Sequence, residues 1–386
     1  MLNEAEFESE LVRYLETVGN TKQWEYRPDI KTTEQLWQNF REILERNNQE
    51  ALRGHPLTDG EFAQVQREIC DLKTPYDAGR FLYGFNGRST VSVLRDEAHD
   101  TEAQSMILTI FKQDEVGAGN TTYQIVNQIR REHVQAGMQD RRFDTTLLIN
   151  GLPIIHIEEK ADRHDAYEGL NQIRQYIDEG LFGDIYSTTQ ILIGMTPHDT
   201  RYMANTDARS FNTDFAFHWQ TESENKTVWE WKAFCDKMLS IPMVHYMATK
   251  YMILDGARDH KQLMVMRPYQ VYATRRVIER LRAHEFGMDP LEVGYVWHTT
   301  GSGKTVSSFK TAWLASRLPN VDKVVFLVDR RALTSQTYDN YAAYDPDTDD
   351  DNNGGVISDT RNTGDLRRRL RSSHTENNII VTSIQK

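Results

Sequence analysis

The sequence predicts an α/β protein of two domains, with a mixed sheet in the first and a parallel sheet in the second. Its 386 residues exceed what one hydrophobic core usually supports. Short apolar runs typical of strands are interspersed with amphipathic helical patterns. After about residue 267, helix and strand alternate, as in a parallel sheet covered by helices. We expect the domains to span 1–255 and 256–386.

The composition excludes several classes of protein. Hydrophobic residues make up 39% and charged residues 26% of the chain, which indicates a packed fold rather than disorder. Asp and Glu number 57 against 45 Lys and Arg, for a net charge of -12, so a DNA contact requires a local basic groove. The two cysteines match no zinc spacing, no apolar run reaches about 18 residues, and the acidic start is no signal peptide. A cytoplasmic protein without a membrane partner is expected.

The elements of the first domain follow from residue spacing. Apolar residues recur at three- and four-residue steps in 7–18 and in 33–47, which predicts two helices. The run FDTTLLINGLPIIHIEEK at 143–160 predicts a hairpin, because Asn150-Gly151 is a tight-turn pair between two β-rich segments. The other predicted elements are strands at 91–94, 106–111, 123–129 and 191–194 and helices at about 165–177 and 223–260.

The second domain is predicted to alternate helices with strands. Its runs are YQVYATRRVIERL, EVGYVWH, VSSFKTAWLASRL, KVVFLVD and NIIVTSI, at 269–281, 292–298, 306–318, 323–329 and 378–384. The first and third have helical spacing, and the other three are short apolar runs typical of buried strands. We expect a parallel sheet.

Three charged residues in the predicted hairpin indicate chemistry. Asp144 is expected to open its first strand, and Glu158 and Lys160 lie two residues apart in its second, so alternation places these two side chains on one face. Two converging carboxylates suit Mg²⁺, and an adjacent lysine can orient an attacking water and offset phosphate charge. The pattern predicts phosphodiester hydrolysis. Each residue alone would be an ordinary surface choice, so the hairpin context carries the prediction.

The run RRFDTTLLINGLPIIHIEEK, followed by NQIRQY, resembles the PD-(D/E)xK nuclease domain of the motor (R) subunits of type I restriction endonucleases. The resemblance implies that Asp144 and Glu158 bind the metal, that Lys160 is the catalytic lysine and that Gln172 and Tyr176 support the site. Members of that family carry an apolar residue between the glutamate and the lysine. Here Glu159 occupies that position, and it must find a partner if it is buried.

The opening run EAEFESELVRYLETVGN also resembles the first helix of that family, from which an acidic residue joins the site. Glu8 is our first choice, with Glu4, Glu6 and Glu10 as alternatives.

A second motif, WHTTGSGKT, has the expected context of a phosphate-binding loop, between a strand and a helix. Its glycines let backbone N–H groups approach phosphate, Lys304 reaches the β and γ oxygens, and Thr305 can bind Mg²⁺. The full pattern has glycine where His298 stands, but HTTGSGKT resembles the form in superfamily 2 helicases and translocases. The residues expected to bind ATP here are Thr300, Gly301, Ser302, Gly303, Lys304 and Thr305.

Three further segments resemble helicase motifs. RPYQ resembles the Q motif, in which the amide of Gln270 would read adenine, and VVFLVDRRALTSQ and NIIVTSIQK resemble motifs Ia and Ib, which contact the DNA backbone. The resemblance implies a RecA-like domain that is only partly contained in this sequence, with a DExH box expected beyond Lys386. The expected DNA contacts are Arg330, Thr334, Gln336, Thr382 and Gln385.

The resemblance as a whole implies a Mg²⁺- and ATP-dependent subunit that cleaves double-stranded DNA beside separate specificity and methyltransferase subunits. One alternative is an ATP-dependent helicase or remodeller whose nuclease fold only binds DNA, and the intact Asp144, Glu158 and Lys160 argue against it. The other is the restriction subunit of a type III system. The position of the nuclease motif near the amino end favours type I.

Overall fold

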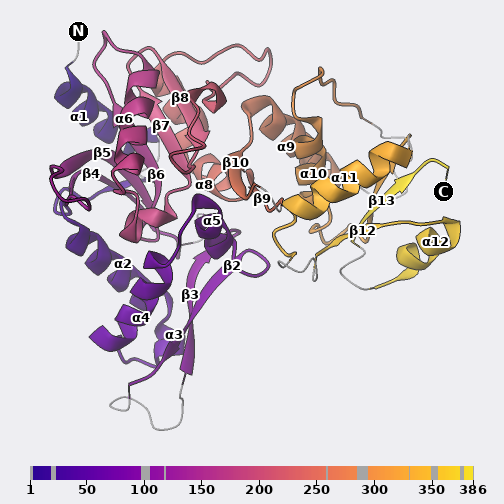
Figure 1. The fold of residues 1–386 in the computed structure, drawn as a ribbon, viewed down its shortest axis with the longest axis horizontal. Helices are drawn as coiled ribbons and strands as arrows, with labels where there is room; N and C mark the ends of the chain where they lie inside the picture. Colours follow the sequence, from indigo (N-terminus) through magenta and orange to yellow (C-terminus); the bar gives the residue numbers. More distant parts are fainter. Residues whose placement is uncertain are drawn as a thin grey trace. The chain divides into compact units, whose positions relative to one another are not determined.

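The chain was analysed as a computed structural model, which describes residues 3–18, 23–96, 105–116, 119–257, 260–284, 294–329, 331–348, 355–373 and 378–385. It divides into two compact units (Figure 1). The first comprises 1–221, 226–250 and 263–265, and the second comprises 222–225, 251–262 and 266–386. No helix in the described ranges is both long and apolar enough to cross a bilayer.

The predicted amino-terminal helices are confirmed. α1 (Glu4–Leu15) begins at a capping box between Asn3 and Glu6, and α2 (Thr33–Asn47) begins at one between Thr32 and Gln35. These reciprocal bonds satisfy backbone N–H groups that the first helical turn leaves without a partner. The apolar stripe of α1 is buried, and Glu8 is buried with it.

The first unit is built on a six-stranded sheet in the order β1-β4-β5-β6-β7-β8. β4 with β5, β5 with β6 and β7 with β8 are antiparallel, whereas β1 with β4 and β6 with β7 are parallel. The sheet is therefore mixed, as predicted. Its strands are β1 (Glu25–Tyr26), β4 (Tyr123–Arg131), β5 (Arg141–Ile149), β6 (Leu152–Glu159), β7 (Ile191–Met195) and β8 (Thr200–Ala204).

The predicted hairpin is formed by β5 and β6. Asn150 and Gly151 make its turn with φ of 53° and 80°, the left-handed region that Asn and Gly enter most readily. A Cβ on Gly151 would also lie 2.9 Å from the Cα of Phe40 in α2, so this position requires glycine. β5 starts earlier than expected, and Asp144 lies within the strand rather than at its start.

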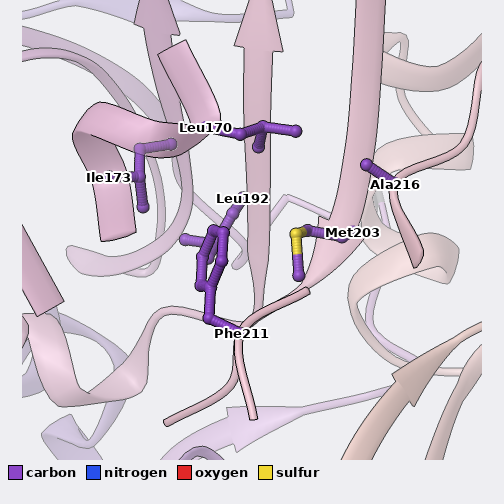
Figure 2. Packing of buried hydrophobic residues seen from close by; sticks show 6 residues of the cluster. All are labelled: Leu170, Ile173, Leu192, Met203, Phe211 and Ala216. Carbon is purple, nitrogen blue, oxygen red and sulfur yellow. The ribbon is translucent and has the colours of Figure 1, made fainter. Parts of the chain in front are cut away.

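α6 (Ala166–Asp178) lies over β6 and β7 (Figure 1). Figure 2 shows Leu170 and Ile173 of this helix packed with Leu192 of β7 in a buried cluster. A Cβ on Gly194 in β7 would lie 2.0 Å from the carbonyl oxygen of Ala166. Because Gly194 has no side chain, α6 approaches the sheet closely here and packs on both β6 and β7.

The remaining elements of the first unit surround this sheet. A two-stranded antiparallel ribbon of β2 and β3 packs against short helices, at the strand positions predicted for 91–94 and 106–111. These elements are α3 (Gln49–Leu52), α4 (Asp59–Cys70), α5 (Pro75–Tyr83), β2 (Arg88–Leu94), β3 (Ser105–Lys112), η2 (Asp184–Thr188), η3 (Thr213–Phe215), α7 (Trp231–Phe234), the π-helix η4 (Cys235–Leu239), α8 (Met243–Ala248) and β10 (Gln262–Val265).

The second unit contains a three-stranded parallel sheet in the order β11-β13-β12, which confirms the predicted class. α11 packs on β12 and β13, and α10 packs against α9. The elements are β9 (Met252–Asp255), α9 (Pro268–Ala283), α10 (Lys304–Ala315), β11 (Val324–Val328), α11 (Arg331–Tyr344), β12 (Ile357–Asp359), α12 (Thr363–Arg371) and β13 (Ile379–Ser383).

Two predictions of secondary structure were wrong. Residues 252–255, expected in a helix, form β9, because Met252, Ile253 and Leu254 are all buried and such a continuous apolar run suits a strand. The strand expected at 292–298 is not formed at 294–298, and its first two residues lie outside the described ranges. Tyr295 and Trp297 are 89% and 86% exposed. A strand requires a neighbour for its N–H and C=O groups, and none of the described strands pairs with this segment.

Candidate active site

The β5–β6 hairpin brings three charged side chains together at the end opposite its turn. The ammonium group of Lys160 donates to Glu158 Oε1 at 3.3 Å and to the carbonyl oxygen of Glu159 at 3.0 Å. Asp144 Oδ2 accepts a hydrogen bond of 3.2 Å from the backbone N–H of Glu159. Strand pairing thus places Asp144, Glu158 and Lys160, which lie up to 16 residues apart in the sequence, around one small volume.

Burial changes the acid–base behaviour of these groups. Burial, and then the negative charge of Glu158, raises the pKa of Asp144 well above its ordinary value. Burial raises the pKa of Glu158 to about 7, against the opposing effect of Lys160. Burial lowers the pKa of Lys160, but the charges of Glu158 and Asp144 outweigh it and raise that pKa overall. The two carboxyl groups therefore favour their protonated form more than exposed carboxyl groups do, chiefly because they are buried.

This donor set fits a hard divalent cation. Carboxylate oxygens are the ligands that Mg²⁺ prefers, and a bound cation would favour the ionised form of these buried carboxyl groups. Within the ranges that the structure describes, no group of three or more His, Cys, Asp or Glu side chains is arranged to hold a metal ion. A cation would therefore be held by the pair Asp144 and Glu158, with waters and phosphate oxygens completing its shell.

Among the acidic residues of α1, Glu8 is the one linked to Asp144. The Glu8 side chain is buried, at 9% exposure, and its carboxylate accepts hydrogen bonds from Asn127 Nδ2 at 2.9 Å and from Gln128 Nε2 at 3.1 Å. Gln128 Nε2 also lies 3.3 Å from Asp144 Oδ1. One amide group thus connects the helix carboxylate with the strand carboxylate.

The alternatives in α1 lie elsewhere. Glu6 bonds to the backbone of Asn3 in the capping box, and Glu10 is part-exposed. Glu4 Oε1 lies 3.8 Å from the Lys160 ammonium group, so Glu4 approaches the lysine rather than Asp144.

The expected supporting pair lies on α6. Gln172 Nε2 donates a hydrogen bond to the hydroxyl of Tyr176, and the Tyr176 ring stacks on Phe143 of β5 with the ring centroids 5.0 Å apart. Burial, and then the negative charge of Glu158, raises the pKa of Tyr176. The hydroxyl therefore stays neutral at ordinary pH.

Glu159 is buried at 1% exposure. One of its oxygens accepts a long hydrogen bond of 3.4 Å from the N–H of Thr145, and the other has no hydrogen-bond partner among the described residues. Burial, and then the charge of Asp144, raises the pKa of Glu159 well above its ordinary value. A protonated, neutral carboxyl group explains how glutamate occupies this position.

The sequence analysis missed three residues that contact the candidate site: Asn127, Gln128 and His156. His156 Nε2 lies 3.3 Å from Glu158 Oε2, and burial lowers the pKa of His156 to about 4, so its ring is neutral at pH 7. Strand alternation could have identified His156, since it lies two residues before Glu158 on the same face. The sequence carries no comparable signal for Gln128, whose role depends on its backbone conformation.

In the second unit, the glycines of the expected phosphate loop adopt the left-handed conformation that the loop requires. The φ angles of Gly301 and Gly303 are 80° and 75°, and α10 begins at the next residue, Lys304. The Lys304 ammonium group donates to the Thr299 carbonyl at 2.8 Å. Of the other expected ligands, Thr300 is exposed, and Ser302 and Thr305 are part-buried. The loop therefore presents its backbone at the start of a helix, where an anion is favoured.

Gln270 contacts this loop directly. Its side chain is buried, and Nε2 donates to the carbonyl oxygens of Ser302 at 3.0 Å and Gly303 at 3.3 Å, while Oε1 accepts from the N–H of Arg267. The structure therefore places Gln270 against the loop backbone.

The expected DNA contacts differ in accessibility. Gln336 and Gln385 are exposed, and Gln385 Nε2 donates to the Asp329 carbonyl. Thr334 and Thr382 are buried, at 4% and 1% exposure, and the hydroxyl of Thr360 bonds to that of Thr382. β13 is the central strand of its sheet, which covers the Thr382 side chain. Arg330 lies outside the described residues.

A family profile described as the N terminus of the type I restriction enzyme R protein matches residues 1–211, which is more than half of the chain. The chain belongs to this family. The resemblance of the hairpin and of α1 to R proteins is thereby confirmed. A second profile, of the res subunit of type III restriction enzymes, matches residues 263–386 of this R-protein chain, the part that contains the expected phosphate loop.

Curated R-protein relatives extend over both units. The chain is 33% identical over 384 residues to the type I restriction enzyme SauCOLORF180P endonuclease subunit of Staphylococcus aureus, covering 100% of this chain and 37% of that protein. It is 32% identical over 357 residues to the SsaAORF53P endonuclease subunit of Staphylococcus saprophyticus, covering 92% and 34%. The EcoprrI endonuclease subunit of Escherichia coli is 26% identical over 306 residues, covering 76% and 87%. The chain thus spans little more than a third of the length of the staphylococcal relatives.

Proposed function

We propose that the first unit is a PD-(D/E)xK nuclease domain that hydrolyses DNA phosphodiester bonds with Mg²⁺. The observation that carries this proposal is the convergence of Asp144, Glu158 and Lys160 at one end of the β5–β6 hairpin, with the ammonium group 3.3 Å from Glu158 Oε1. The division of the chain near residue 255 into a nuclease domain and an ATP-binding domain is part of the proposal.

Each residue has a role that follows from its chemistry. Asp144 and Glu158 would hold the cation, with Glu8 beside them. Mg²⁺, when bound, would offset the charge of the scissile phosphate and make a bound water more acidic. Lys160, whose pKa is raised, keeps its proton and would donate hydrogen bonds to a phosphate oxygen and to the attacking water. Gln172 and Tyr176 would hold the lysine side of the site in place.

For the second unit we propose ATP binding at Thr300–Thr305, with Lys304 on the β and γ phosphates and Thr305 on the Mg²⁺ that accompanies ATP. Gln270 fixes the backbone of this loop through Ser302 and Gly303. In the whole protein, ATP hydrolysis would drive translocation along double-stranded DNA, and specificity and methyltransferase subunits would select the DNA. We favour the type I assignment over type III because the amino-terminal profile is that of type I R proteins.

Asp144→Asn provides a test, because it removes a proposed metal ligand and a destabilising ionisable group together. Folded Asp144 keeps its proton at pH values where the unfolded chain has lost it, so its cost to stability is absent below about pH 4 and grows as the pH rises. Without divalent cations, Asp144→Asn should therefore raise the free energy of unfolding above neutral pH, by at least about 1 kcal/mol, the equivalent of one pKa unit. DNA cleavage by the assembled full-length enzyme should be lost.

Thermal melting across a pH series, in chelator, and plasmid cleavage measure the two effects. Asp140→Asn is the matched control, because contacts with His133 and Arg130 hold the pKa of Asp140 below its usual range. Neutralising Asp140 should bring no gain in stability at high pH and should leave cleavage intact. Normal cleavage by Asp144→Asn would show that Asp144 does not bind the catalytic metal.

A further inference from the structure

Gln128 has an unusual backbone conformation for its place in the fold. It lies inside β4, between Asn127, which pairs with Thr145, and Ile129, which pairs with Phe143, yet its φ is 54°. A non-glycine residue in the left-handed region is strained and persists only where surrounding contacts hold it. The other described non-glycine residues with positive φ lie in turns or at helix ends. Gln128 therefore stands out as a strained residue within a strand.

The strained backbone directs the Gln128 amide to two carboxyl groups. Nε2 lies 3.1 Å from each oxygen of Glu8 and 3.3 Å from Asp144 Oδ1. Since carboxylates accept hydrogen bonds and only the nitrogen of the amide can donate, the nitrogen must face this pair. Asp144 lies between Phe143 and Thr145, the β5 residues that pair with Ile129 and Asn127, so Gln128 and Asp144 occupy corresponding positions of the two strands and the amide reaches the site.

A second amide fixes Glu8 from the other side. Asn127 Nδ2 donates to Glu8 Oε1 at 2.9 Å. The orientation of this amide is set by Lys31, which can only donate and whose ammonium group lies 2.6 Å from Asn127 Oδ1. The Tyr26 hydroxyl donates to the same oxygen at 2.9 Å. Glu8 is thus held by neutral donors whose own positions are fixed.

Neutral donors suit a site that must bind a cation. An ammonium or guanidinium group between Glu8 and Asp144 would neutralise the carboxylates and compete with Mg²⁺. An amide can donate to both carboxyl groups without supplying the charge that the metal must supply. Groups of this kind, which orient metal ligands, commonly contribute about 10- to 100-fold to metal affinity or activity.

We propose that Gln128 is a positioning residue of the nuclease site, whose left-handed backbone turns its amide between Glu8 and Asp144 and so fixes the metal ligand Asp144 against Glu8. This inference rests on the proposed nuclease function. Gln128 itself need not contact the metal or the DNA.

Two substitutions distinguish the effect of the Gln128 amide from the effect of its backbone strain. Gln128→Ala removes the amide and keeps the strain, whereas Gln128→Gly removes both, because glycine adopts positive φ readily. Both variants of the full-length protein should bind Mn²⁺ about 10- to 100-fold more weakly than wild type in calorimetric titrations with the metal alone. Gln128→Gly should melt at a higher temperature than Gln128→Ala. A purely structural role would instead make metal affinity follow melting temperature.

Gln124→Ala is the matched control. Gln124 is buried in the same strand and its amide bonds to Asn39, away from the site, so its loss should lower the melting temperature and leave Mn²⁺ affinity unchanged. The Asp144→Ala variant, which lacks a proposed metal ligand, measures how much Mn²⁺ binds at other places on the protein. Wild-type Mn²⁺ affinity in Gln128→Ala, or full recovery of that affinity in Gln128→Gly, would overturn the proposed role of Gln128. Neither result would bear on the proposed nuclease site. Wild type that binds no more Mn²⁺ than Asp144→Ala would overturn the proposed nuclease site and this inference with it.

Discussion

Replacing Lys160 with alanine in the full-length protein, assembled with its partner subunits, is expected to abolish DNA cleavage and to leave ATP hydrolysis largely intact. The Lys160 ammonium group lies beside Glu158, where it would contact the scissile phosphate, and it belongs to a different unit from Lys304. Loss of one charged donor to a developing negative charge costs about 100-fold or more in rate.

Plasmid linearisation and phosphate release, measured on the same preparation, test this expectation. Lys73→Ala is a suitable control, because the side chain of Lys73 is 75% exposed and lies outside the hairpin, so both activities should persist. If Lys160→Ala still cuts at a normal rate, the nuclease assignment is wrong. The alternative of a helicase whose nuclease fold only binds DNA would then be favoured.

Lys304→Ala is expected to remove ATP hydrolysis, again by about 100-fold or more, because this lysine would stabilise the charge on the transferred phosphate. Lys304 is the first residue of α10, directly after the left-handed Gly303. Its ammonium group donates to the carbonyl oxygen of Thr299 in the loop. Cleavage should be lost as well, because we propose that the nuclease acts only after the motor has moved along DNA.

The two lysine variants therefore differ in one activity, ATP hydrolysis, and each serves as the control for the other. Phosphate release at a normal rate from Lys304→Ala would remove the phosphate-loop assignment. Normal cleavage by Lys304→Ala with ATP hydrolysis lost would show that the nuclease works without the motor, and the coupling between the two activities would have to be abandoned.

Local signals in the sequence were sufficient to predict the part of the fold that carries the candidate site. The Asn150-Gly151 turn fixes the pairing of β5 with β6, and this pairing determines which side chains can meet. Helical spacing predicted α6 and predicted that Gln172 and Tyr176, four residues apart, lie on one face of it. These features depend on short-range geometry, which a sequence pattern records directly.

Other features depend on contacts between distant segments, and the sequence pattern could not reveal them. The choice of Glu8 over its neighbours follows from the packing of α1 against β5 and β6. The left-handed conformation of Gln128 is maintained by tertiary contacts and carries no local signal, since glutamine has no preference for positive φ. The burial of Thr382 follows from its place in a central strand, whereas the motif alone indicated an exposed contact.

The missing strand at 294–298 has a similar explanation. Its sequence contains the β-forming residues Tyr295, Val296 and Trp297, but strand formation depends on a neighbour to pair with. Single-sequence patterns indicate the preference of a segment and not the presence of its partner.

Anomalous scattering from crystals of this chain soaked in Mn²⁺ shows whether Asp144 and Glu158 bind a metal. We expect an anomalous peak about 2–2.5 Å from carboxylate oxygens of both residues, the range of divalent cation–oxygen bonds. The peak should disappear in Asp144→Asn crystals. Mn²⁺ bound elsewhere, with no peak between Asp144 and Glu158 at saturating metal, would show that these two residues are not a metal site.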